Sequence, residues 1–212
     1  MSESACAIVL AGGSSRRMGT DKALLSVGDW PLVTWMSQRL GSLVEHVIVA
    51  GPLAYQVLAP TVLVVPDELP GRGPLGGLVS ALRQSAHPLC FVIAVDMPLV
   101  QPQLVLAMLA EAREHPEADV VALRDDGQWQ PLHAVYRSSC LPVAAERLGG
   151  ADRSLHGLLR EVRLHELPTE RRDALDPGRL STRGANTEAE WAVLLEVASR
   201  DAVLRRNWPK KS

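Results

Sequence analysis

The fold of this chain is constrained most by the alternation of short apolar segments with segments that carry helix-start signals. Apolar runs of roughly four to eight residues are what a strand needs when helices cover both faces of its sheet, as in a parallel sheet. Such runs predict strands at Cys6–Leu10, Val47–Ala50, Val62–Val65, Leu89–Val95, Ala118–Leu123 and Leu132–Tyr136.

Between these runs lie segments with the features of helices. Three of them directly follow a proline, a residue that suits the first helical position, and Thr187 with Glu190 has the spacing of a capping box. The predicted helices are Leu32–Leu43, Leu75–Arg83, Gln103–Glu114, Ser138–Leu148 and Thr187–Arg200. The polar segment Pro168–Arg183 reads as a loop or weak helix. Strand–helix alternation predicts a doubly wound α/β fold, a three-layer α/β/α domain with a mostly parallel sheet.

Length and composition bound the domain count and the partners. A chain of 212 residues suits one domain, which we place at residues 1–204, and we expect the basic tail 205–212 to be disordered. The net charge of -2 gives no reason to expect nucleic-acid binding. No apolar stretch reaches the ~20 residues of a membrane span, so we expect no membrane partner. Three widely spaced cysteines fit free thiols and a cytoplasmic location.

The first predicted strand runs into a Gly-rich, basic loop, Leu10–Lys22 (LAGGSSRRMGTDK). Glycines after a strand let backbone N–H groups turn toward an anion, and Arg16, Arg17 and Lys22 add positive charge. The spacing matches neither the P-loop nor the dinucleotide-binding motif. The sequence therefore predicts a phosphate site of another kind, with a plain Gly-rich turn as the alternative.

Two aspartates follow other predicted strands. Asp67 comes after the third strand and precedes a Gly/Pro-rich stretch, and Asp96 ends the strongest apolar strand. A carboxylate at a strand end can accept hydrogen bonds from a base or sugar, or hold a hard cation such as Mg2+. The alternatives are a solvated Asp67 and an Asp96 that caps a helix or a loop.

The pattern L-A-G-G-x-x-x-R-M-G-x-D-K resembles the signature of the nucleotidyltransferases related to MobA, the molybdenum cofactor guanylyltransferases. Arg17, Met18, Gly19, Asp21 and Lys22 match it. The resemblance implies a Rossmann-like nucleotidyltransferase fold and a magnesium-dependent enzyme. Carried over position by position, it implies nucleotide contacts at Leu10, Ala11, Gly12, Gly13, Arg17, Lys22, Asp67 and Asp96.

The same resemblance implies that Arg17, Lys22 and Asp96 are catalytic. Asp96 begins a D-x-P-L motif similar to the one that carries the family's metal aspartate, so Mg2+ is the expected cofactor. Asn186 and Thr187 match the end of the family's N-x-N-T. Asn186 is a candidate for contact with the acceptor substrate or for capping the last helix. His133 is a candidate for contact with the acceptor substrate or for packing in the core.

The chain departs from the family pattern at two positions. Ala50 and Gly184 stand where relatives often have Asn, so any side-chain contact from those positions is missing here.

The function that the resemblance implies is transfer of GMP from GTP to the phosphate of molybdopterin or molybdenum-molybdopterin, with release of pyrophosphate. The family also implies transient contacts with cofactor-biosynthesis or acceptor proteins. One alternative is a cytidylyltransferase or sugar-phosphate nucleotidyltransferase of the same fold. A second is a GTP-binding carrier or regulatory protein without turnover, and a dehydrogenase is disfavoured because the dinucleotide motif is absent.

Overall fold

A computed structural model describes residues 3–12, 21–69 and 71–200 of the chain. Its main sheet is built from β1 (Ala5–Leu10), β4 (His46–Ala50), β5 (Leu63–Val65), β6 (Leu89–Ala94), β7 (Val120–Asp125), β8 (Gln128–Arg137) and β9 (Leu164–Glu166). The seven strands lie in the order β5-β4-β1-β6-β8-β7-β9. All neighbours pair in parallel except β8, which runs antiparallel to β6 and β7. The mostly parallel sheet is confirmed.

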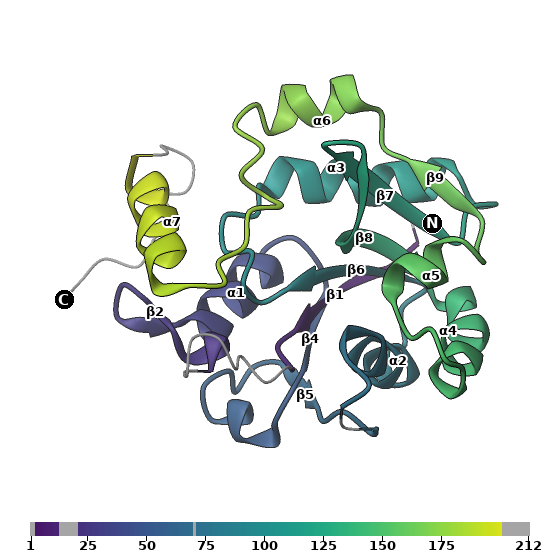
Figure 1. Ribbon diagram of the computed structural model, residues 1–212, viewed down its shortest axis with the longest axis horizontal. Coiled ribbons are helices and arrows are strands. Elements are labelled where there is room, and N and C mark those ends of the chain that lie inside the picture. Colours follow the sequence, from purple (N-terminus) through teal and green to yellow (C-terminus); the bar gives the residue numbers. More distant parts are fainter. Residues whose placement is uncertain (1–2, 13–20, 70, 201–212) are drawn as a thin grey trace.

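Helices connect the strands and cover both faces of this sheet (Figure 1). The α-helices are α1 (Leu32–Gly41), α2 (Pro74–Gln84), α3 (Pro102–Glu114), α4 (Leu141–Gly149), α5 (Leu155–Leu159), α6 (Thr169–Leu175) and α7 (Glu188–Arg200). Three 3-10 turns are η1 (Lys22–Leu24), η2 (Leu53–Gln56) and η3 (Ser138–Cys140), and a small hairpin pairs β2 (Ser26–Val27) with β3 (Trp30–Pro31).

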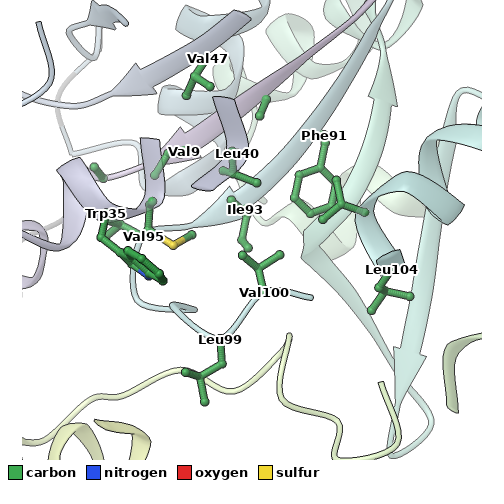
Figure 2. Close-up of a cluster of buried hydrophobic side chains, with 14 of the residues drawn as sticks. Val9, Trp35, Leu40, Val47, Phe91, Ile93, Val95, Leu99, Val100 and Leu104 are labelled. Atoms are coloured by element: carbon green, nitrogen blue, oxygen red, sulfur yellow. The ribbon is translucent and has the colours of Figure 1, made fainter. Parts of the chain in front are cut away.

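The two layers of helices follow from the alternation of side chains along each strand. On β1, Ala7 and Val9 pack in one core with residues of α1, α3 and α7, whereas Ile8 and Leu10 pack in a second core with residues of α2, α4 and α5. Figure 2 shows the first core, where side chains of β1, β6, α1 and α3 meet. Every residue of β1 is buried, which is why its sequence is continuously apolar.

The predicted elements are found with shifted ends. All six predicted strands and all five predicted helices have a counterpart. The predicted capping box is present at the start of α7. Glu190 N–H donates to Thr187 Oγ1 at 3.2 Å, and Thr187 N–H donates to Glu190 Oε2 at 3.2 Å. The structure adds β9, α5, the small hairpin, and α6 inside the segment predicted as a loop or weak helix. The tail 205–212 lies outside the described residues, so the proposed domain boundary stays a prediction.

The three cysteines form no disulfide, as their wide spacing predicts. Cys6, Cys90 and Cys140 are buried free thiols. Among the described residues, no helix has both the length and the apolar character needed to cross a bilayer.

Candidate active site

The carboxyl ends of β1, β4, β5 and β6 meet at one edge of the sheet, where open α/β folds bind ligands. A cavity of about 220 Å³ lies there between the ends of β1 and β6. A second cavity of about 640 Å³ extends toward β4 and β5. The residues that line both cavities are Leu10, Ala11, Gly12, Asp21 and Pro74, so the two are neighbours around the exit of β1.

Backbone hydrogen bonds fix the loops at this edge. Ala11 N–H donates to Ala50 O at 2.9 Å, Gly51 N–H to Val65 O at 2.9 Å, and Val95 N–H to Leu10 O at 3.0 Å. The ladder therefore continues one residue beyond each strand, which holds the cavity floor in place. Another cavity of about 640 Å³, lined by His46 and His87 among others, lies at the amino ends of β4 and β6, away from this edge.

Lys22 and Asp96 form an ion pair at the smaller cavity. Lys22 Nζ lies 2.5 Å from Asp96 Oδ2, and the side chains are 16% and 23% exposed. Lys22 Nζ also donates to Asn186 Oδ1 at 2.9 Å. These contacts join residues 74 and 164 positions apart in the sequence. Partial burial limits screening by salt, so the attraction between these two charges is stronger than it would be on an exposed surface.

Asp21 holds the turn that presents Lys22. As the cap of η1, Asp21 accepts a hydrogen bond from Ala23 N–H at 3.0 Å through Oδ1. Its Oδ2 accepts a hydrogen bond from the hydroxyl of Tyr55, which is itself buried. Burial and the nearby Asp21 carboxylate raise the pKa of Tyr55 well above its ordinary value, so the hydroxyl stays protonated and donates. Tyr55, which also lines the larger cavity, therefore anchors the start of η1.

Asp67 lies on the wall of the larger cavity and packs against the first turn of α2. Its Oδ1 accepts a hydrogen bond from Leu69 N–H at 3.0 Å. A Cβ atom at position 76 would lie 2.9 Å from Asp67 Oδ1 and 3.0 Å from Oδ2, so only a glycine at that position leaves the carboxylate where it is. Ala50 lines the same cavity and contributes no polar side-chain atom there.

The structure thus gathers most of the predicted nucleotide contacts around one pair of cavities. The gathered residues are Leu10, Ala11, Gly12, Lys22, Asp67 and Asp96. The predicted Gly13 and Arg17 lie outside the described residues. Sequence reasoning assigned no role to Tyr55, and gave Asp21 only as a motif match. The one signal for Asp21 was its position directly before Lys22 in the loop.

Asn186 uses its backbone and its side chain in different places. Its N–H donates to Glu190 Oε2 at 2.6 Å near the start of α7, whereas its side-chain oxygen accepts from Lys22. The side chain therefore faces the Lys22–Asp96 pair instead of capping the helix. Gly184 is close by: a Cβ atom there would lie 3.4 Å from Asp96 O and 3.6 Å from Asp96 Oδ1.

His133 lies in the core, as its packing interpretation expects. It is 0% exposed, pairs with Ile93 across β6 and β8, and meets Phe91 edge-on with ring centroids 5.0 Å apart. Burial lowers the pKa of His133 to about 4, so the ring is neutral near pH 7. Because His133 is enclosed, a contact with an acceptor substrate would require the core to open; that role stays a prediction.

The chemistry of Asp96 fits the expected Mg2+. Within the described residues, Asp96 Oδ1 accepts no hydrogen bond, and Oδ2 is paired with Lys22. Mg2+ prefers a small number of carboxylate oxygens and completes its octahedron with water and phosphate oxygens. A single aspartate on a cavity wall that also includes Asp21 and Lys22 is consistent with that preference.

Sequence comparison decides the family. The MobA-like NTP transferase domain matches residues 7–167 of the chain. The chain belongs to this family. A probable molybdenum cofactor guanylyltransferase of Pelotomaculum thermopropionicum is 32% identical over 204 residues, which cover 96% of this chain and 98% of that protein. A protein of the same name from Synechococcus elongatus is 33% identical over 194 residues, 89% of this chain and 96% of that one.

Solved structures confirm the fold. The molybdopterin-guanine dinucleotide biosynthesis protein A of Archaeoglobus fulgidus superposes with a TM-score of 0.78 at 24% identity, covering 92% of this chain and all of that one. CMP:2-keto-3-deoxy-manno-octonic acid synthetase, solved with CTP, gives a TM-score of 0.67 at 15% identity, over 93% of this chain and 99% of that one. This member of the MobA-like family therefore has the Rossmann-like nucleotidyltransferase fold and belongs among the nucleotidyltransferase enzymes.

Proposed function

We propose that this enzyme transfers the GMP group of GTP to the terminal phosphate of molybdopterin, with or without molybdenum, and releases pyrophosphate. The observation that carries the proposal is the meeting of Lys22, Asp96 and Asn186 at the cavity beside the exit of β1. The names of its relatives, molybdenum cofactor guanylyltransferases, support the choice of substrates.

The reaction needs charge neutralisation more than it needs a base. An oxygen of the acceptor phosphate attacks the α-phosphorus of GTP, the bond from the α-phosphorus to the bridging oxygen breaks, and pyrophosphate leaves. The nucleophile is already an anion, so no group has to remove a proton from it. Positioning and preorganised positive charge then account for most of the rate enhancement.

Each charged residue has a place in this scheme. Lys22 would exchange its contact with Asp96 for the phosphates and stabilise the negative charge of the leaving pyrophosphate, together with the predicted Arg17. Asp96 would hold Mg2+, which supplies Lewis-acid neutralisation of the phosphate oxygens when bound. Asp67, at the far wall of the larger cavity, would accept hydrogen bonds from the guanine or its ribose.

The proposed exchange of partners is consistent with the Lys22–Asp96 ion pair. An ammonium and a carboxylate that are both less than a quarter exposed are costly to leave unpaired, and each neutralises the other. A magnesium–triphosphate complex brings the opposite charge for both groups at once. The pair therefore keeps the cavity preorganised without a net local charge.

Nucleotide competition tests the proposal. Purified protein, molybdopterin and Mg2+ are incubated with GTP, CTP, ATP or UTP, and both the dinucleotide product and pyrophosphate are measured. We expect product with GTP and far less with the other three, and turnover about 10²- to 10³-fold lower with Lys22→Ala. Preferential use of CTP would replace the proposal with a cytidylyltransferase. GTP binding without pyrophosphate release in the presence of acceptor would replace it with a carrier protein.

A further inference from the structure

A second cluster of ligating side chains lies where α3 ends beside the edge strand β9. Glu111 is in the last turn of α3, His115 follows the helix one turn later, and His165 is the middle residue of β9. Glu111 Oε1 lies 2.9 Å from His165 Nε2 and 3.5 Å from His115 Nε2. The Glu111 side chain is 8% exposed, whereas the two imidazoles are 35% and 27% exposed.

The cluster is distant from the proposed active site along the sheet. His165 pairs with Val121 near the beginning of β7, and the nucleotide cavities open at the carboxyl ends of the strands. Glu111, His115 and His165 line neither of these cavities. The proposed guanylyl transfer therefore does not use them.

The donor set and spacing fit a divalent transition metal. Two imidazole nitrogens and one carboxylate oxygen are the ligands of many zinc sites that leave a fourth position to water. Metal–ligand bonds of about 2.0–2.1 Å in a tetrahedron put ligand atoms about 3.4 Å apart, close to the two distances from Glu111 Oε1.

The groups around the cluster orient the ligands. His115 Nδ1 is 3.0 Å from Glu117 Oε1, which leaves Nε2 directed toward Glu111. The second oxygen of Glu111 accepts a hydrogen bond from Arg171 of α6. Carboxylates that hold the other nitrogen of a ligating histidine, and hydrogen bonds that hold a ligating carboxylate, are the usual outer partners of a metal site.

One adjustment is required for binding. The rings of His115 and His165 are stacked, with centroids 3.7 Å apart and planes at 21°. A ligated metal lies in the plane of each imidazole, so the rings have to tilt apart about their Nε2 edges. Their partial exposure leaves room for that tilt.

We propose that Glu111, His115 and His165 form a binding site for a divalent transition metal of the zinc class, which fastens β9 to α3. Strand β9 is three residues long and half-buried, and it pairs with one neighbour among the described residues, β7. A metal shared between α3 and β9 would add a long-range link at this edge and stabilise the folded state in proportion to its occupancy.

The test uses the full chain without an affinity tag, stripped of metal by chelation and kept in excess Mg2+ so that oxygen-donor sites are filled. Zn2+ binding is measured by calorimetry, and Co2+ binding by its visible absorption, whose intensity reports the coordination geometry of the bound ion. We expect one equivalent to bind to the wild type, and the Tm to rise by about 5–11 °C at 100 times the Kd.

Three variants locate the site. His115→Gln and His165→Gln should each abolish the Co2+ absorption and the rise in Tm, while their metal-free Tm stays near that of the wild type because both rings are partly exposed. Glu117→Gln, at a 65% exposed position, should weaken Zn2+ binding by about 10- to 100-fold without loss of folding. His156→Gln, at an exposed position in α5, is the matched control and should bind like the wild type.

Two results would overturn the proposal. One is the absence of a Co2+ signal and of a Zn2+-dependent Tm shift in the wild type. The other is binding that persists in both His115→Gln and His165→Gln. In that case loss of binding in His87→Gln would assign the metal to Glu45, His46 and His87, where His46 Nδ1 lies 2.8 Å from His87 Nε2.

Discussion

Gly76, in the first turn of α2, offers a direct way to move Asp67 without mutating it. An added Cβ would come within 2.9 Å of Asp67 Oδ1, 3.0 Å of Oδ2 and 3.2 Å of Arg72 Cβ. Carbon atoms do not approach oxygen that closely, so Gly76→Ala forces the Asp67 carboxylate to rotate. Its hydrogen bond from Leu69 N–H is then lost.

The effect on stability should be small because two terms of opposite sign offset each other. Replacing a helical Gly by Ala stabilises a helix by roughly 0.5–1 kcal/mol. Loss of the hydrogen bond to Asp67 costs about 1 kcal/mol or slightly more. The free energy of unfolding of Gly76→Ala should therefore stay within about 1 kcal/mol of the wild type.

The effect on GTP should be large if Asp67 holds the nucleoside. A hydrogen bond to a charged group is worth about 1.5–3 kcal/mol, which corresponds to an increase of about 10- to 100-fold in the Kd of GTP. The kcat at saturating GTP should change little, because Lys22 and Asp96 line the smaller cavity whereas Asp67 lines the larger one.

A double-mutant cycle makes this prediction refutable. GTP affinity is measured by calorimetry for the wild type, Gly76→Ala, Asp67→Ala and the double variant. If position 76 acts through Asp67, the double variant should bind like Asp67→Ala alone. Gly149→Ala is the control, since a Cβ there meets nothing within 4 Å. Wild-type affinity in Gly76→Ala, or losses that add in the double variant, would refute the reasoning.

Other residues give independent predictions. Lys22→Ala should lower kcat by about 10²- to 10³-fold with a small change in Tm, and unchanged turnover would remove its catalytic role. Asp96→Asn should abolish the Mg2+-dependent turnover, measured by titrating Mg2+ after chelation of the protein. Tyr55→Phe removes the hydrogen bond to Asp21 and should lower kcat through Lys22; a lower Tm with unchanged kcat would show that Tyr55 matters for stability alone. Because burial lowers the pKa of His133 to about 4, the unfolded chain binds a proton near pH 6.5 that the folded protein rejects. The contribution of neutral His133 to the free energy of unfolding is complete above pH 6.5 and falls as the pH drops toward 4. Between pH 7 and pH 5 the wild type should lose about 2 kcal/mol of unfolding free energy through this residue, and His133→Leu should not show that loss when unfolding by denaturant is measured at both pH values.

The strands that sequence reasoning found are those whose burial is visible in composition. β1 and β6 are apolar throughout because helices cover both of their faces. β9 was missed because Leu164, His165 and Glu166 have no strand pattern of their own, and its position depends on pairing with β7. The longer β8 could have been predicted: Asp126-Gly127 has the residues of a two-residue hairpin turn, and both adopt positive φ, 46° and 75°.

The candidate site was predictable as a set of residues, and their contacts were not. Lys22, Asp67 and Asp96 follow predicted strands, whose carboxyl ends share one edge in any parallel sheet. Lys22 pairs with Asp96 and Asn186 across 74 and 164 positions of the sequence, and no local pattern encodes contacts of that range. Tyr55 reaches Asp21 from η2, a 3-10 turn for which the sequence has no local signal.

The segment before α7 places Gly184 beside Asp96. Gly184 packs against Asp96 at an ordinary contact distance for a Cβ atom, so a side chain there would stand beside the carboxylate proposed to hold Mg2+. Position 184 offers no amide to Asp96. Among the described residues, the side-chain partner of that carboxylate is Lys22, and Asn186 fixes Lys22 by its side-chain oxygen. Lys22 would therefore have to serve both the aspartate and, in the proposed reaction, the phosphates.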